Sequence, residues 1–256
     1  MLSTFQNIAI VLLIIGGALA LLWLLRLFWP GEQRRPHNEL IGWQISVLGT
    51  AYAVIVGFML YAVWTNFEVA DGNAEAEANS LVNVVRIARG LPSAQKIADL
   101  GRRYVEIMLT QEWPAMSRLV VDPSSHPVME QLWTTLMKTP IHNASEQTSL
   151  DHAITQLAKM TEHRRLRVLQ ANANLPEILW TVLIIGAILT IVSACLFDTA
   201  NFKLHLIQVS MLSLLLALVL VAIADINRPF QGSVHVVPAG WDQARATLAR
   251  MKSITK

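Results

Sequence analysis

The sequence predicts an all-α integral membrane protein with four membrane-spanning helices. Of its 256 residues, 54% are hydrophobic and only 15% are charged, whereas an average soluble domain carries about 25% charged residues. The apolar residues are gathered in four blocks, each long enough to cross a bilayer as a helix. No strand-like alternation is sustained between the blocks. The net charge of +2 is too small to indicate nucleic-acid binding.

The first two spans are predicted at residues 8–29 and 41–67. The flank before residue 8 has no Lys or Arg, and the apolar run is too long for a signal peptide, so we expect the first span to be retained. Residues 30–40 form a short polar link. The helical pattern of the second span continues to Arg89, where Gly90, Leu91 and Pro92 end it. This pattern predicts one long helix that projects beyond the membrane.

Residues 68–176 are predicted to form a helical extramembrane domain that starts as the continuation of the second span. Apolar residues recur at helical spacing, and prolines divide the part after residue 93 into two long helices and shorter pieces. Charges of alternating sign are typical of solvated helix faces. His142, His152 and His163 are interpreted as exposed polar residues.

The third and fourth spans are predicted at residues 177–197 and 206–224, so that residues 1–67 and 177–224 form the transmembrane part. The tail, residues 225–256, ends in a short basic amphipathic helix near 243–251. Asp225 and Arg228 are close enough to pair at the end of the fourth span. The single Cys195 is interpreted as a small packing residue, and His205 as an interfacial residue.

Catalytic and metal-binding patterns are absent from the sequence. There is no zinc-ligand spacing, phosphate loop, nucleotide fingerprint or nucleophile elbow. No cluster of titratable residues lies at membrane depth. We therefore expect no enzyme activity, no metal and no cofactor.

The second span carries two adjacent stripes of residues. A small residue at every fourth position would let another helix approach closely. If several copies surrounded an axis, the large apolar members of the second stripe would form a hydrophobic constriction that gates by dewetting. Alternatively, both stripes pack within the four-span bundle of one subunit. The packing stripe is Gly49, Ala53 and Gly57, and the candidate pore-lining stripe is Thr50, Val54, Phe58, Tyr61 and Thr65.

The continuation of this helix carries a polar stripe: Glu68, Asp71, Glu75 and Asn79. These residues recur at spacings of three and four, so they share one helix face. The stripe either lines a polar vestibule, which would concentrate cations, or faces bulk water.

Two motifs carry a resemblance to a known family. Residues 55–90, IVGFMLYAVWTNFEVADGNAEAEANSLVNVVRIARG, resemble the second span and following helix of the bestrophin channels. The segment after the fourth span resembles the bestrophin-like family of bacterial membrane proteins of unknown function, whose tail motif is Asp-x-x-Arg-Pro-Phe-x-Gly. With four spans and a helical insert between the second and third, the resemblance covers nearly the whole chain. The tail motif is present as Asp225, Arg228, Pro229, Phe230 and Gly232.

The resemblance implies a homo-oligomeric, anion-permeable channel for inorganic ions in a bacterial inner membrane, pentameric in bestrophins, with a neck lined by the second span. Carried over from the Gly57–Phe58 pair, the neck residues would be Thr50, Val54 and Phe58. The acidic cluster that binds calcium in bestrophins is missing, because no carboxylate follows Gly232 until Asp242. Ala51 also stands where animal members have a neck proline.

Two questions stay open at this point. The basic residues Arg26, Arg34, Arg35 and Lys203 flank the short links and by the positive-inside rule place them in the cytoplasm. The bestrophin arrangement places the helical domain there instead, and we follow the resemblance.

The alternative function is a non-conducting scaffold or sensor whose helical domain binds a partner protein, with both stripes of the second span buried within one subunit.

Overall fold

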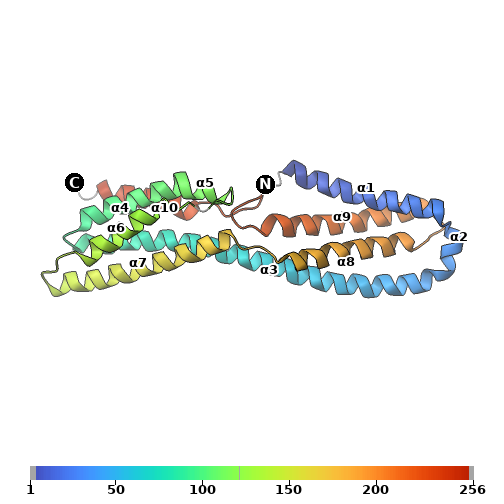
Figure 1. Ribbon diagram of the computed structural model, residues 1–256, viewed down its shortest axis with the longest axis horizontal. Helices are drawn as coiled ribbons and strands as arrows, with labels where there is room; N and C mark the ends of the chain where they lie inside the picture. The colour runs from blue at the N-terminus through green and yellow to red at the C-terminus, as the bar shows by residue number, and fades with distance from the viewer. Residues whose placement is uncertain (1–3, 121, 254–256) are drawn as a thin grey trace. The chain divides into compact units, whose positions relative to one another are not determined.

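The computed structural model describes residues 4–120 and 122–253, and within these residues every regular element is helical (Figure 1). Four helices are long and apolar enough to cross a membrane, as predicted. The all-α, four-span fold is therefore confirmed. The helices are α1 (Thr4–Phe28), α2 (Gly31–Arg34), η1 (Arg35–His37), α3 (Asn38–Ile87), η2 (Ala88–Gly90), α4 (Ala94–Ile107), η3 (Met108–Glu112), α5 (Trp113–Met116), α6 (His126–Met137), α7 (Ala144–Ala171), α8 (Glu177–Leu196), α9 (Phe202–Ile226) and α10 (Ala239–Ser253).

The chain divides into two compact units, and α3 contributes residues to both. The first unit comprises residues up to 65, with 174–227 and 232–234, and the second comprises residues 66–173, 228–231 and those from 235 onward.

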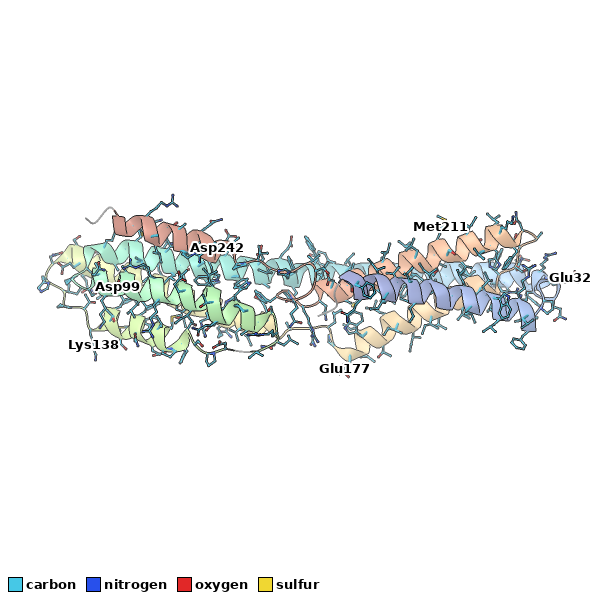
Figure 2. All side chains as sticks on the ribbon, turned by 90° about the horizontal axis from the view of Figure 1, so that it is seen from above. Glu32, Asp99, Lys138, Glu177, Met211 and Asp242 are labelled. Carbon is cyan, nitrogen blue, oxygen red and sulfur yellow. The ribbon has the colours of Figure 1, made fainter. Side chains whose placement is uncertain are left out.

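The first unit packs α1, α8, α9 and the first part of α3 together. One apolar cluster joins Leu22 of α1, Cys195 of α8 and Val209 of α9. Cys195 is fully buried and its thiol lies 3.7 Å from the carbonyl of Ala18, which agrees with its interpretation as a packing residue. Large apolar side chains such as Met211 face outward from this unit (Figure 2), as expected where lipid replaces water.

Tyr52 fixes the inner face of α3 in the first unit. Its hydroxyl donates to the carbonyl of Leu183 at 2.9 Å, and its ring lies so close to Gly186 that a Cβ there would overlap it. Ile41 and Val63 are also buried and stand eleven residues to either side, close to three helical turns. The face of α3 that carries these three residues therefore packs on the subunit's own bundle.

The predicted polar link between α1 and α3 is itself helical and is formed by α2 and η1. Arg34 within it is 1% exposed, and its guanidinium donates to the carbonyl of Cys195 at 2.8 Å. Asp198 accepts from Arg34 at 3.5 Å and from Arg35 at 2.8 Å. A guanidinium at the carboxyl end of α8 satisfies carbonyls that have no helical partner. Arg34 therefore joins the link between α1 and α3 to the link between α8 and α9. The sequence alone indicates Arg34 as a marker of membrane topology.

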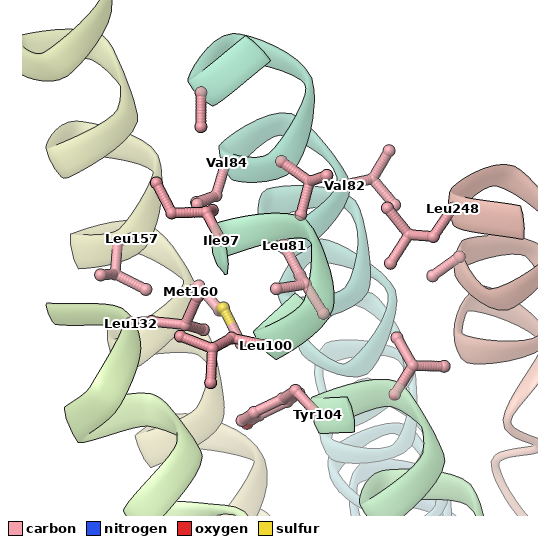
Figure 3. Packing of buried hydrophobic residues seen from close by; sticks show 14 of the residues in the cluster. Leu81, Val82, Val84, Ile97, Leu100, Tyr104, Leu132, Leu157, Met160 and Leu248 are labelled. Carbon is pink, nitrogen blue, oxygen red and sulfur yellow. The ribbon is translucent and has the colours of Figure 1, made fainter. Parts of the chain in front are cut away.

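The second unit is a helical bundle built from the later part of α3 with α4, α6, α7 and α10. Its core is one large apolar cluster that includes Leu81, Leu132 and Met160 (Figure 3). Gly101 of α4 lets that helix approach α3, because a Cβ at this position would lie 2.7 Å from Val85. Residues 68–176, predicted as a helical insert between the second and third spans, supply these helices except α10, which comes from the tail and packs into the same core.

Candidate functional site

The predicted pore-lining stripe lies on the outer face of α3. Val54 follows Tyr52 by two residues, which turns it by about 200° around the helix and away from the bundle. Val54, Phe58 and Tyr61 are 54%, 66% and 69% exposed, and Thr50 is also exposed. Thr65 is half-buried. Within one subunit, the four exposed residues therefore do not pack against the other spans.

The small-residue stripe is also free within the subunit. A Cβ added at Gly49 or at Gly57 would meet nothing within 4 Å, and Ala53 is exposed. The exposed members of the two stripes therefore do not favour the alternative that both stripes pack in the bundle of one subunit, whereas Gly49 and Thr65 are half-buried. What lies against them in the membrane stays a prediction.

The hydroxyl of Thr50 in this stripe bonds to its own helix. Its Oγ1 donates to the carbonyl of Ser46 at 2.8 Å, and the Ser46 hydroxyl donates to the carbonyl of Gly42 at 2.9 Å. Such bonds satisfy a hydroxyl donor without a partner from another helix. The hydroxyl donors of Ser46 and Thr50 on the outer face of α3 are therefore already used, and Val54 and Phe58 present apolar side chains there.

The predicted vestibule stripe is exposed throughout in the second unit: Glu68, Asp71, Glu75 and Asn79 all face away from the bundle. Its edge is bordered by the start of α10. A Cβ at Gly240 would lie only 3.2 Å from the Cα of Glu75, so glycine permits this close approach. Asp71 and Glu75 also border a cavity of about 160 Å³ together with Trp113.

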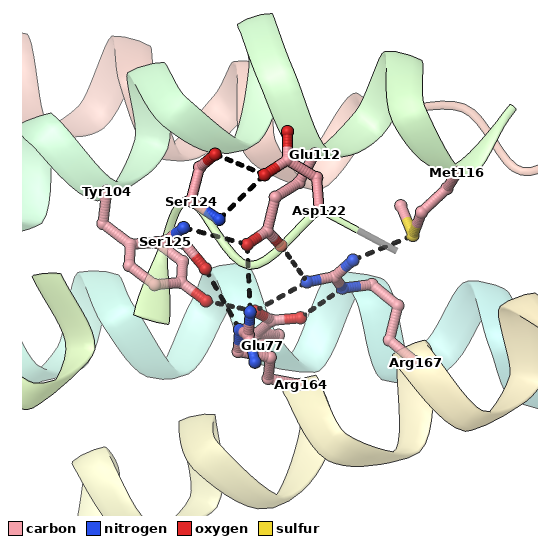
Figure 4. Close-up of polar contacts among 9 residues, drawn as sticks. All are labelled: Glu77, Tyr104, Glu112, Met116, Asp122, Ser124, Ser125, Arg164 and Arg167. Atoms are coloured by element: carbon pink, nitrogen blue, oxygen red, sulfur yellow. Dashed lines mark hydrogen bonds and ion pairs between the residues drawn. The ribbon is translucent and has the colours of Figure 1, made fainter. Parts of the chain in front are cut away.

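The opposite face of α3 carries a buried ion network that the sequence interpretation missed. Glu77 is fully buried and faces Arg167 of α7, also fully buried, with Nε–Oε2 and Nη2–Oε1 distances of 2.6 and 3.3 Å (Figure 4). Tyr104 donates its hydroxyl to Glu77 at 2.7 Å. Burial and the Glu77 carboxylate raise the pKa of Tyr104 well above its ordinary value of 10. The tyrosine therefore stays a neutral donor.

A second carboxylate completes the network from a π-helical turn. Glu112 ends η3, and its oxygens accept from Arg167 at 3.1 Å, from Arg164 at 2.9 Å and from the Ser125 amide at 3.0 Å. Burial alone would raise the pKa of Glu112, but Arg167, Ser125 and Arg164 outweigh it and hold the pKa below 4.5. Two buried carboxylates thus face two guanidiniums.

His163 also bonds to α3, in contrast to its prediction as a simply exposed residue. It is half-buried, and its Nδ1 lies 2.9 Å from Oδ1 of Asn73. The Asn73 amide donates to Gln170 at 3.1 Å. Together with Arg167, these contacts give α7 three polar attachments to α3, because the two helices face each other over more than one turn.

The tail motif folds into a turn that is held by its first residue. Asp225 accepts the amides of Ser233 and Val234 at 2.9 and 3.0 Å. Gly232 has a φ of +88°, which favours glycine, and a Cβ there would lie 2.5 Å from the Asp225 carboxylate. The predicted pair of Asp225 with Arg228 is wrong: Arg228 instead donates to Gln231 at 3.4 Å. The backbone amides of Ser233 and Val234 occupy the Asp225 carboxylate in place of Arg228.

The remaining motif residues pack the tail onto the second unit. Phe230 is buried and meets Trp113 edge-on, with ring centroids 5.5 Å apart. The carbonyl of Pro229 accepts the amide of Val236 at 2.7 Å. In the part of the chain that the structure describes, no group of three or more His, Cys, Asp or Glu could hold a metal ion.

The comparisons with known proteins agree with this geometry. The sequence profile of the bestrophin-like domain matches residues 12–241, which is most of the chain. The chain belongs to the bestrophin-like family. The resemblance read from residues 55–90 and from the tail motif is thus confirmed. No curated protein matches the chain.

Solved structures share the bestrophin-like fold at low sequence identity. A bacterial bestrophin homologue from Klebsiella pneumoniae is 15% identical, with a TM-score of 0.72, and the match covers 96% of this chain and 98% of that one. A mutant of that homologue matches at 15% identity and a TM-score of 0.71, over 96% and 99% of the two chains. A structure described as a membrane protein matches at 14% identity and 0.71, over 96% and 98%.

One residue of the buried network, Glu77, could have been recognised from the sequence of this bestrophin-like protein. Glu77 falls two residues after Glu75, and therefore on the face of α3 that Ala74, Ala78 and Leu81 bury. A carboxylate on a buried face requires a cationic partner. Arg167 could not be chosen from the sequence, because its neighbours Arg164 and Arg165 are equally basic and only the fold separates them.

Proposed function

We propose that this bestrophin-like protein forms a homo-oligomeric ion channel whose pore is lined by the outer stripe of α3. The observation that carries the proposal is the exposure of Val54 and Phe58 on the face opposite Tyr52. An apolar stripe facing away from its own bundle can line an axis shared with other copies. The membrane location follows from the four apolar helices, and we propose the bacterial inner membrane.

The neck in this proposal is a set of apolar rings. Several copies of Val54 and Phe58 around an axis leave a passage whose wall offers no hydrogen bonds, so water leaves it readily and conduction stops. Tyr61 and Thr65 would continue the pore beyond the neck. Gly49, Ala53 and Gly57 supply the close helix contact that brings neighbouring copies of α3 together. The pentameric state comes from the family resemblance.

We propose that the channel is permeable to anions, with the neck as the selective element. Large anions hold their hydration shells less tightly than small cations, so an apolar constriction admits them with less loss of hydration energy. Glu68, Asp71 and Glu75 in the vestibule act in the opposite direction, since exposed carboxylates raise the local concentration of cations. The permeant ion is therefore decided by which element limits the current.

The channel is tested by ion flux from liposomes that contain the purified oligomer. Phe58→Ala is expected to raise conductance at least several-fold, because it removes the largest side chain of the neck. Leu215→Ala on α9 is the matched control, since Leu215 is 59% exposed on a different span. An equal rise in both variants would refute the assignment of the neck.

This test distinguishes failure of the proposed anion selectivity from failure of the proposed channel. A reversal potential that follows the chloride gradient supports the anion proposal, and one that follows the cation gradient overturns selectivity while leaving the pore. The absence of flux from folded oligomers over a range of pH and voltage would overturn the channel. The non-conducting scaffold or sensor would then be the better proposal.

A further inference from the structure

The end of α5 holds a leucine in a backbone conformation that normally belongs to glycine. The amide of Val120 donates to the carbonyl of Ala115 at 3.0 Å, and the amide of Leu119 donates to Met116 at 3.1 Å. These two bonds define a Schellman motif, whose left-handed position is usually glycine. Leu119 occupies that position with a φ of +59°. The chain therefore keeps a bulky side chain where its backbone is strained.

This strained turn places apolar side chains on the surface. Leu119 and Val120 are 44% and 54% exposed, and Arg118 before them is exposed as well. In water, neither the strain at Leu119 nor the exposure of two large apolar side chains is favourable. An environment that receives both side chains would compensate for the two together.

The turn borders the end of α7, which a short connection joins to the span α8. Leu119 and Val120 border a cavity together with Ala171 and Asn172, at the end of α7. Asn172 precedes Glu177, the first residue of the span α8, by five residues. Five residues reach at most about 17 Å when fully extended. This covalent length limits how far the end of α7 can lie from the start of the span α8.

We propose that Arg118, Leu119 and Val120 form an interfacial membrane anchor. Leu119 and Val120 enter the boundary between the lipid headgroups and the acyl chains, and the Arg118 guanidinium binds lipid phosphate. An arginine next to apolar residues suits this boundary, because its charged end stays among the headgroups while its stem lies along apolar surface. The proposed anchor requires that the four spans cross the membrane, but it does not require that the protein conducts ions.

A bilayer fits this turn better than a second copy of the chain. A stable protein interface buries about 800 Å² on each partner, which three residues cannot supply. Lipid sets no such minimum, since each apolar side chain that leaves water contributes by itself. The exposed guanidinium also complements the phosphates of an anionic bilayer.

The anchor is tested by spin labelling of the full-length oligomer in liposomes that contain phosphatidylglycerol. A nitroxide is attached to Val120→Cys, and its collisions with oxygen, which enters lipid, are compared with those of a water-soluble nickel chelate. Met137→Cys is the matched control, because Met137 is 61% exposed and apolar but ends α6, which leads into the start of α7, at the opposite end of that helix from Ala171. The native Cys195 is fully buried, and the protein without an added cysteine measures its background.

The proposal expects an oxygen-to-nickel collision ratio at Val120 at least several-fold above the ratio at Met137. Arg118→Gln should lower the ratio at Val120 in anionic liposomes, because the turn then loses its phosphate contact. Equal ratios at the two sites would overturn the anchor, since Val120 would then face water. A Val120 label that meets neither reagent would overturn it in favour of a contact between subunits. Leu119→Cys provides the same test if the Val120 variant does not fold.

Discussion

Removing the charge of Arg167 should destabilise the second unit strongly. Arg167 is fully buried and is the one cation that bonds Glu77, at 2.6 and 3.3 Å, among the residues that the structure describes. The change Arg167→Met keeps much of the side-chain volume but leaves the Glu77 carboxylate with only the Tyr104 hydroxyl. Burial alone would lower the pKa of Arg167, but Glu77 and the other network groups raise it above its ordinary value, so the lost group is a full positive charge.

The magnitude follows from the cost of an unpaired buried charge. Breaking a buried ion pair by removing one partner typically costs about 3–5 kcal/mol. Glu112 is less affected, because it keeps Arg164 and the Ser125 amide. For a unit of this size, a loss of that order lowers the midpoint of thermal unfolding by roughly 10–20 °C.

Intrinsic fluorescence of the detergent-solubilised protein measures this loss, since Trp113 and Trp241 lie in the second unit. Arg165→Met is the matched control, because Arg165 is exposed on the same helix and pairs with the exposed Glu162 at 2.7 Å. We expect no measurable change for this control. High salt should not reduce the effect of Arg167→Met, because buried pairs are poorly screened. A loss below about 1 kcal/mol, or a loss that disappears in salt, would refute the buried network.

Three further predictions concern other contacts. Gly232→Ala should free the tail turn and speed its proteolysis, because the new Cβ would overlap the Asp225 carboxylate and the left-handed φ would be strained. Glu112→Gln should weaken the dependence of stability on pH in the acid range, because the pKa of Glu112 is lowered in the folded state. The stabilisation by Glu112 is therefore present above pH 4.5 and is lost as the pH falls through the folded pKa. A pH-dependent melting series in which the variant and the unmodified chain lose stability equally would contradict this. Arg34→Gln should lower the unfolding temperature of the first unit, with a loss of about 1–3 kcal/mol, because the Cys195 carbonyl at the end of α8 loses a buried donor while Asp198 keeps Arg35; a melting curve like that of the unmodified chain would rule this out.

Much of the fold could be predicted because lipid imposes simple rules. Helices that cross a bilayer must be long and apolar, so the four spans appear directly in the sequence. The continuation of α3 to Ile87 was predictable as well, since no glycine pair or proline interrupts it before Gly90. The start of the fourth span was less precise: α9 begins at Phe202 because Asn201 accepts the amides of Lys203 and Leu204.

The contacts between distant residues were not predictable. Asp225 and Arg228 have opposite charges and helical spacing, yet Asp225 bonds the turn at Ser233 because two backbone amides converge on it. Likewise, His163 reads as a solvent-facing residue until Asn73 is placed beside it. Helical periodicity gives the face on which a residue lies, but it does not give the neighbour across that face.

The buried network also suggests why α3 is so heavily attached to α7. Replacing a buried ion pair by apolar residues is often neutral, so stability alone does not explain Glu77 and Arg167. We infer that the pair fixes the rotation of α3 about its own axis, which decides whether Asp71 and Glu75 face outward. Asn73 adds a second attachment on the same face.

Thiol labelling tests this inference in a variant that carries both Glu77→Met and Arg167→Met. The double variant should regain part of the stability that Arg167→Met loses, because no unpaired charge remains. With the native pair, a water-soluble maleimide should react quickly with Asp71→Cys and slowly with Ala74→Cys, since Ala74 is 4% exposed. Without the pair, a helix that can rotate should expose position 74 and bring the two rates closer by several-fold. Rates that keep their original ratio in a folded double variant would mean that apolar packing alone holds the register of α3.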